Sequence, residues 1–117
     1  MSEIITDETK VFLASHPVDM RKSINGLAAI VEGSFDLDLY EDCLFVFCSK
    51  DHAKIKALKW DADGFVLYYK RRERGTFQWP KNFRNNDTDQ IPRSDLNRLL
   101  SGLIMESYIK RRHFVTV

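Results

Sequence analysis

The clearest pattern of hydrophobic and polar positions lies between residues 54 and 72, which read KIKALKWDADGFVLYYKRR. Apolar and polar residues alternate on both sides of Asp63-Gly64, and a period of two is typical of β-strands. An Asp-Gly pair suits the positive φ angles of a tight two-residue turn. The pattern therefore predicts a β-hairpin with strands near 53–60 and 65–72.

The same period assigns the side chains of this hairpin to two surfaces. With Asp63-Gly64 as the loop, Trp60 faces Leu67. Leu58 faces Tyr69 on the same side, so this surface is apolar near the turn. The other surface is cationic with an aromatic residue in its middle, and it carries Ile55, Ala57, Lys59, Tyr68, Lys70 and Arg72. A four-residue loop preserves this division, whereas a three-residue loop would scramble it.

Two further strands and a helix are indicated in the N-terminal half. Residues 10–15 (KVFLAS) predict a first strand, and residues 43–48 (CLFVFC) are hydrophobic throughout, as in a central strand that is covered on both faces. Between them, apolar residues recur at helical spacing over 20–32, and Asp19 is the expected N-cap. The predicted buried stripe of this helix is Met20, Ile24, Leu27 and Val31.

The C-terminal half predicts a short strand, a loop and a second helix. Residues 76–79 read as a closing strand, and residues 81–90 are polar and rich in turn-forming residues. Pro92 suits the first turn of a helix. Its apolar face would be lined by Leu96, Leu99, Leu100 and Leu103.

The order of these elements predicts one α+β domain over residues 1–117. We expect a mainly antiparallel sheet of four to five strands with two helices packed on one face, so that the outer face stays open to solvent. Residues 1–9 are expected to be a flexible acidic tail, and residues 104–117 form a C-terminal extension of unassigned structure.

Composition excludes several classes of protein. The 117 residues are 44% hydrophobic, which argues against disorder, and no apolar run approaches the roughly 18 residues of a membrane span. The acidic N-terminus lacks the features of an export signal. Cys43 and Cys48 would point to opposite faces of one strand, which opposes a disulfide and offers no metal site. We therefore expect a cytoplasmic protein without metal or cofactor.

The net charge of +1 conceals an uneven distribution. Residues 1–49 carry three basic and nine acidic side chains, whereas residues 50–84 carry ten basic and four acidic ones. Positive charge gathered around a hairpin is typical of nucleic-acid binding, although solvated strands also carry lysines that protect sheet edges. The candidate nucleic-acid-binding residues are Lys56, Lys59, Tyr68, Lys70, Arg71, Arg72 and Arg74, with Tyr69 as a further stacking surface. No code for reading bases is visible in this set.

Arg21 and Lys22 form a candidate anion site in the first turn of the expected helix. Helix N-termini offer free N–H groups to anions, and two cations there would add to the attraction. The alternative is an ion pair between Arg21 and an acidic residue of the same chain, with Asp36, Asp38 and Asp42 as the candidates.

A catalytic site is not supported by the carboxylates of the hairpin. Asp61 and Asp63 are explained by turn chemistry. Glu73 would lie about nine strand residues from the turn, or roughly 30 Å at 3.3 Å per residue. These groups cannot share a metal ion, so we expect no catalytic residue.

Several short motifs resemble, in order and spacing, one family of bacterial proteins. They are Val18-Asp19-Met20-Arg21-Lys22, Gly26-Leu27-Ala28, Leu44-Phe45-Val46-Phe47, Lys54-Ile55-Lys56, Trp60-Asp61-Ala62-Asp63-Gly64 and the run from Lys70 to Pro80. The chain is similar over about residues 10–103 to the accessory TnpB (second open reading frame, Orf2-like) proteins of IS66-type insertion sequences, which are distinct from the RNA-guided TnpB nucleases. It departs from them at Lys59-Trp60, where the family commonly has two tryptophans. It also departs at Ile91-Pro92-Arg93, where a Ser or Thr often caps the helix.

The resemblance implies a non-catalytic accessory role in DNA transposition, next to a separate transposase. Combined with the charge pattern, it leads us to expect contact with DNA through the basic hairpin face. The alternative is a protein-interaction module that docks the transposase or another protein of the element without touching DNA.

Overall fold

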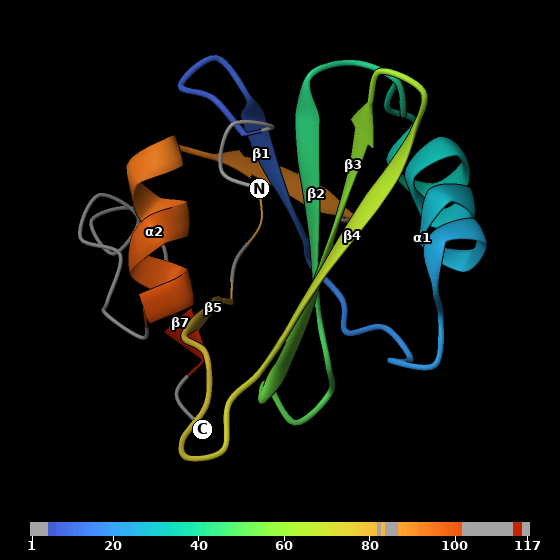
Figure 1. Cartoon of the computed structure of the whole chain (residues 1–117). Helices are drawn as coiled ribbons and strands as arrows, with labels where there is room; N and C mark the ends of the chain where they lie inside the picture. The colour runs from blue at the N-terminus through green and yellow to red at the C-terminus, as the bar shows by residue number, and fades with distance from the viewer. Residues whose placement is uncertain (1–4, 82, 84–86, 102–113, 116–117) are drawn as a thin grey trace.

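The computed structural model describes residues 5–81, 83, 87–101 and 114–115, and its centre is a five-stranded sheet (Figure 1). The strand order is β4-β3-β2-β1-β6. A second, two-stranded sheet pairs β5 with β7. The elements are β1 (Lys10–Ala14), α1 (Ile24–Ile30), the π-helical turn η2 (Val31–Phe35), β2 (Cys43–Cys48), β3 (Lys54–Asp61), β4 (Gly64–Arg71), β5 (Trp79–Pro80), β6 (Thr88–Ile91), α2 (Arg93–Ser101) and β7 (Phe114–Val115).

The five-stranded sheet is mainly antiparallel. Only the β1–β2 pair is parallel, and α1 lies in the connection between these two strands, as a parallel pair requires a crossover. The other three strand pairs are antiparallel. The predicted α+β class with a mainly antiparallel sheet is confirmed, and so is the central position of residues 43–48.

The two helices lie on opposite faces of the sheet (Figure 1). Leu27 and Val31 pack with Phe45, Phe47 and Leu58 on one face. On the other face, α2 contributes Leu96 and Leu99 to a core with Leu44, Val46, Ile55 and Ala57. The expectation that both helices share one face was therefore wrong. The physical reason is that every residue of β2 is buried, so both faces of this strand require an apolar cover.

The hairpin is displaced in register but keeps its predicted faces. Asp61 pairs with Gly64 and Trp60 with Phe65, so the two-residue turn is Ala62-Asp63 and not Asp63-Gly64. Each residue of β3 therefore faces a partner two positions earlier than the Asp63-Gly64 loop implied. A shift of two residues preserves the alternation, and this pairing is the one expected from a loop spanning residues 61–64.

Helix α1 begins later than the sequence pattern suggested. Its N-cap is Ser23, whereas Asp19 accepts a hydrogen bond from the backbone N–H of Arg21 at 2.9 Å in a preceding turn. The helical segment then runs past Gly33 and ends at Asp36, whose φ of 53° is left-handed. Asp19 is thus not the helix cap that we expected.

Described residues near both ends of the chain contact the rest of the fold. Thr9 is buried, and its hydroxyl donates to Asp42 at 2.8 Å, so residues 5–9 are held beside the linker that precedes β2. In the expected loop over 81–90, residues 88–90 belong to β6 because they pair with β1. The expected closing strand over 76–79 is represented by β5, which pairs with β7. Leu103 and most of the extension over 104–117 lie outside the described residues.

Candidate nucleic-acid interface

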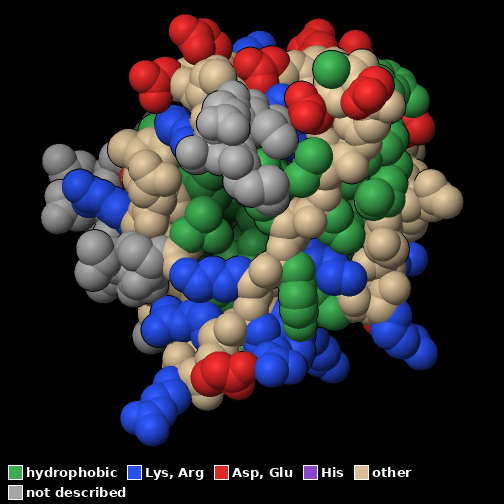
Figure 2. Space-filling view, viewed as in Figure 1, with side chains coloured by type: hydrophobic (Ala, Val, Ile, Leu, Met, Phe, Trp, Pro, Cys, Tyr) green, Lys and Arg blue, Asp and Glu red, His purple; other side chains and the backbone are tan. Residues whose placement is uncertain are grey.

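Strand direction divides the loops of the molecule between two ends of the sheet. Because β1, β2 and β4 run in one direction and β3 runs in the other, the segments 15–23, 49–53 and 72–77 gather at one end. The segments 6–9, 36–42 and 61–63 gather at the other. The first end carries most of the described lysines and arginines, and the second carries a series of carboxylates (Figure 2). We call these the basic end and the acidic end.

The basic end is built around the last residues of β4 and the loop that follows. Its cations on the hairpin and this loop are Lys54, Lys56, Lys70, Arg71, Arg72 and Arg74. Figure 2 shows blue side chains below the sheet, where Figure 1 places the turn after β4. Acidic side chains occupy the opposite edge of the same view. The charge imbalance found along the sequence is therefore also a separation in space.

Three of these cations are held by backbone carbonyl oxygens. Lys56 Nζ donates to the carbonyls of Met20 and Lys22 at 2.7 and 2.8 Å. Lys70 Nζ donates to the carbonyl of Leu100, and Arg72 donates to that of Thr76 at 3.1 Å. A carbonyl carries no net charge, so these bonds fix the position of each cation without neutralising it.

The other two arginines of β4 and the following loop, Arg71 and Arg74, lie at the surface of the protein. Arg71 forms an ion pair with Glu73 at 2.8 Å, and both side chains are more than half exposed. An exposed pair of this kind is worth little in water, so an incoming phosphate can compete with Glu73 for the guanidinium. Arg74 is exposed in the bend after β4.

Lys59 does not belong to this surface, although the sequence pattern placed it there. Its side chain is only 6% exposed, and its ammonium lies 2.9 Å from Asp42. The Lys59 ammonium and the Thr9 hydroxyl both donate to Asp42 and lower its pKa, although partial desolvation opposes them. Lys59 also lies toward the acidic end of β3, since it pairs with Val66. It is therefore excluded from the candidate interface.

The two tyrosines of β4 point to different faces. Tyr69 is 52% exposed, and the ammonium of Lys56 lies 5.6 Å from the centre of its ring. Tyr68 faces the other side, where it is partly buried against the α2 core. Of the two, Tyr69 has the ring that is open for stacking beside the cations. Because β4 is an edge strand, the candidate residues on its two faces lie on either side of this edge and do not form one continuous cationic face.

The predicted anion site at Arg21 and Lys22 lies at the basic end, in the turn before α1. Arg21 binds Asp19 through two guanidinium nitrogens, at 3.0 and 2.7 Å. This hydrogen bonding lowers the pKa of Asp19 to about 2. Arg21 is thus paired within the chain, as the alternative proposed, but with Asp19 and not with the three acids that we named. Lys22 is exposed, and its carbonyl anchors Lys56.

Comparison with known proteins identifies the family. The family model described as "IS66 Orf2 like protein" matches residues 9–110, which is most of the chain. The chain belongs to this family. The expected resemblance is therefore confirmed, and the IS66 Orf2-like protein is an accessory protein of an insertion sequence.

Two curated relatives come from Sinorhizobium fredii (strain NBRC 101917 / NGR234). Uncharacterized protein y4jC is 35% identical over 71 residues, and the match covers 61% of each chain. It therefore spans less than two thirds of that relative's length. Uncharacterized protein y4hO is 32% identical over 94 residues, which is 80% of each chain. No solved structure shows a significant match.

Sequence reasoning missed an aromatic cluster at the acidic end of the IS66 Orf2-like protein. Trp60 makes edge-on contacts with Tyr40 and Phe65, each at 4.9 Å between ring centroids. Tyr40 is 56% exposed and stands in the acidic linker before β2. The sequence pattern does not predict this cluster, because Tyr40 and Trp60 lie twenty residues apart and in different segments.

The His, Cys, Asp and Glu side chains of the described residues form no group of three or more suited to a metal ion. None of the helices within those residues has the length and apolar character needed to cross a membrane. Cys43 and Cys48 are buried and unpaired, and burial raises the pKa of Cys48 to about 12.

Proposed function

We propose that this insertion-sequence accessory protein binds nucleic acid through its basic end, without catalysing a reaction, in the cytoplasm. The main observation behind this proposal is that Lys56, Lys70 and Arg72 lie at the same end of the sheet as the exposed Arg71 and Arg74. These groups come from two strands and one loop, and one of them, Lys56, lies 5.6 Å from the centre of the exposed ring of Tyr69.

Phosphate contact is the chemistry that this end supports best. Cations that are already oriented lose less conformational freedom when they meet a phosphate, and each neutralised phosphate releases condensed counterions. Tyr69 adds a surface on which a base can stack, which is tolerant of sequence. The candidate residues contain no bidentate amide or arginine arrangement aimed at base edges, so we propose binding without strong sequence preference.

The test is a fluorescence anisotropy titration of labelled duplex DNA, single-stranded DNA and RNA at several salt concentrations. The double variant Arg71→Gln and Arg74→Gln should weaken binding to duplex DNA. Its plot of log affinity against log salt should lose about two units of slope, since two phosphate contacts are removed. Neither side chain is needed for the core, so the fold should persist.

Lys10→Gln is the control for loss of a positive charge away from the basic end, because Lys10 is exposed at the acidic end. This variant changes net charge by one unit and should leave the affinity close to that of the wild type. No detectable binding by the wild type at low salt would refute the proposal, and so would an equal loss in Lys10→Gln.

A second candidate function is docking of the transposase or another protein encoded by the element. The observation that favours it is the aromatic cluster of Tyr40, Trp60 and Phe65 among the carboxylates of the acidic end. Exposed tyrosines and tryptophans often dominate binding energy at protein interfaces. A pull-down with the proteins of the element, comparing wild type with Tyr40→Ala, tests it. Retention of a partner by wild type and its loss in the variant would support this function.

A further inference from the structure

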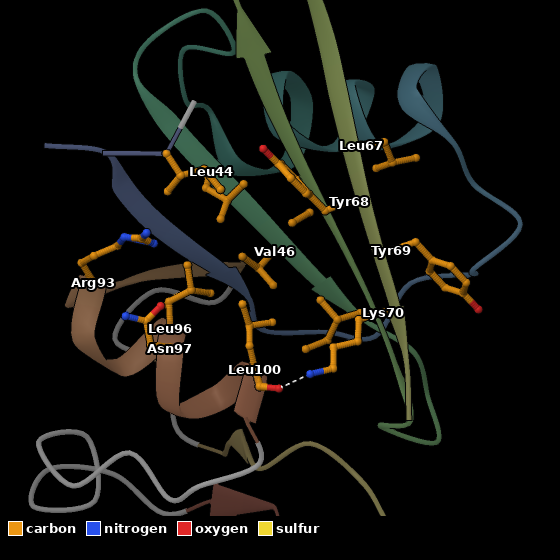
Figure 3. Close-up of a pocket in the computed structure, with 13 residues that line it drawn as sticks. Leu44, Val46, Leu67, Tyr68, Tyr69, Lys70, Arg93, Leu96, Asn97 and Leu100 are labelled. Atoms are coloured by element: carbon orange, nitrogen blue, oxygen red, sulfur yellow. Dashed lines mark hydrogen bonds between the residues drawn. The ribbon is translucent and has the colours of Figure 1, made fainter. Parts of the chain in front are cut away.

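A half-open cavity of about 470 Å³ lies between α2 and the hairpin, on the face of the sheet away from α1 (Figure 3). Its walls are mostly apolar and come from four elements: Leu44 and Val46 on β2, Ile55 and Ala57 on β3, Leu67 and Tyr68 on β4, and Leu96 and Leu100 on α2. This volume falls within the range of roughly 300–1,000 Å³ typical of small-molecule sites. The hollow is also visible between α2 and β4 in Figure 2.

Two cations stand at different ends of this cavity. Arg93 is the first residue of α2, and Lys70 lies near the end of β4. The bond from Lys70 Nζ to the carbonyl of Leu100 joins β4 to the last turn of α2 (Figure 3). Lys70 therefore already has an acceptor at its end of the cavity.

Arg93 differs in that one of its donors lacks an acceptor. Its Nε is buried and has no hydrogen-bond partner among the described residues. An arginine remains protonated in proteins, and a buried donor without an acceptor is unfavourable. The cavity thus combines an apolar lining with one unsatisfied cationic donor at its edge.

We propose that this cavity binds a small apolar carboxylate. Arg93 lines the cavity, and a small turn of its side chain would bring the unpartnered Nε to a carboxylate bound there. The hydrocarbon part would lie against Val46, Ala57 and Leu96. A half-enclosed hollow floored by two strands suits a compact molecule better than an extended peptide. This inference does not rest on nucleic-acid binding, because Arg93 belongs to α2 and not to the cations proposed to bind phosphate.

Calorimetric titration with decanoate and with decanol tests the proposal, because the two probes share a hydrocarbon chain and differ in the anionic group. We expect the wild type to bind decanoate about tenfold more tightly than decanol, as a charge-assisted hydrogen bond allows. Arg93→Met keeps an apolar stem and removes the donors, so it should abolish this preference and leave decanol binding unchanged. Equal affinities in the wild type, or a preference that survives in Arg93→Met, would overturn the proposal.

Four further measurements separate this cavity from other sites. Arg74→Met removes a cation outside the cavity and should not change decanoate affinity, while Arg93→Met should not change DNA affinity. Amide shifts in NMR spectra with decanoate should centre on Ala57 and Leu96. Shifts confined to the basic end would contradict the assignment. Ala57→Leu should reduce binding of both probes by filling the floor, provided that its circular dichroism matches the wild type.

Discussion

At the scale of single residues, the least expected feature is the buried ammonium of Lys59. Its sequence neighbours alternate in the manner of a solvated strand, so the local pattern favoured exposure. The acceptor that allows burial is Asp42, which lies in a different segment of the chain. Contacts of this kind cannot be predicted from periodicity, because periodicity records faces and not the partners that cover them.

Removal of the Asp42 carboxylate should destabilise the protein. Asp42→Asn leaves the Lys59 ammonium buried without its counter-ion, and we expect a loss of about 1–3 kcal/mol in the free energy of unfolding. This loss is smaller than the roughly 3–5 kcal/mol for breaking a fully buried pair, because the Asp42 side chain is about half exposed. Urea denaturation at pH 7 measures the loss. Asp7→Asn, at an exposed carboxylate of the same end, should change stability little.

The same pair predicts a pH dependence. The folded-state pKa of Asp42 is below its ordinary value of 3.8, so its stabilising contribution is fully present above that value. The contribution is lost as pH falls through the lower folded-state pKa. The stability difference between wild type and Asp42→Asn should therefore be constant from pH 5 to 7 and shrink in stronger acid. A difference that grows on acidification would contradict this origin.

At the scale of elements, the hairpin shows what a sequence period can determine. Alternation correctly placed Trp60 and Leu58 on one face and Ile55 and Ala57 on the other, because a shift of two residues leaves the faces unchanged. It could not determine the register, since Asp63-Gly64 and Ala62-Asp63 satisfy the same alternation. It also could not show that α2 covers the face with Ile55, because that contact is remote in sequence.

The observed turn predicts a stabilising substitution. Ala62 has a φ of 52°, and left-handed backbone is unfavourable for alanine by roughly 1 kcal/mol. Asparagine tolerates this conformation better. We therefore expect Ala62→Asn to raise the free energy of unfolding by about 0.5–1 kcal/mol, measured by thermal or urea denaturation. Lys50→Asn, a change to the same residue outside a left-handed position, is the control, and an equal gain there would refute the explanation.

At the scale of the whole molecule, we expect the positions of the charged side chains to affect DNA binding more than the net charge does. The sequence predicted an excess of positive charge near the hairpin, but the grouping of three loops at one end follows from strand direction and was not predicted. The helices cover both faces, so the exposed cations lie around an end of the sheet and not across a face.

Two substitutions with the same change in net charge test this distribution. Glu73→Gln and Asp63→Gln each remove one negative charge, from the basic end and from the acidic end respectively. We expect Glu73→Gln to tighten DNA binding and steepen its salt dependence by up to about one unit, since Arg71 becomes available. Asp63→Gln should have a smaller effect, because screening at 0.15 M salt limits its influence to about 8 Å. Equal gains in an anisotropy titration would show that only total charge matters.

Among the described residues, the separation of carboxylates at one end from ammonium and guanidinium groups at the other amounts to an electric dipole. A net charge of +1 provides little attraction toward a polyanion, but a dipole experiences a torque in its field. The molecule would rotate during approach, so that Arg71 and Arg74 arrive first and the ring of Tyr40 faces away. Alignment of this kind leaves the far side accessible to a second macromolecule.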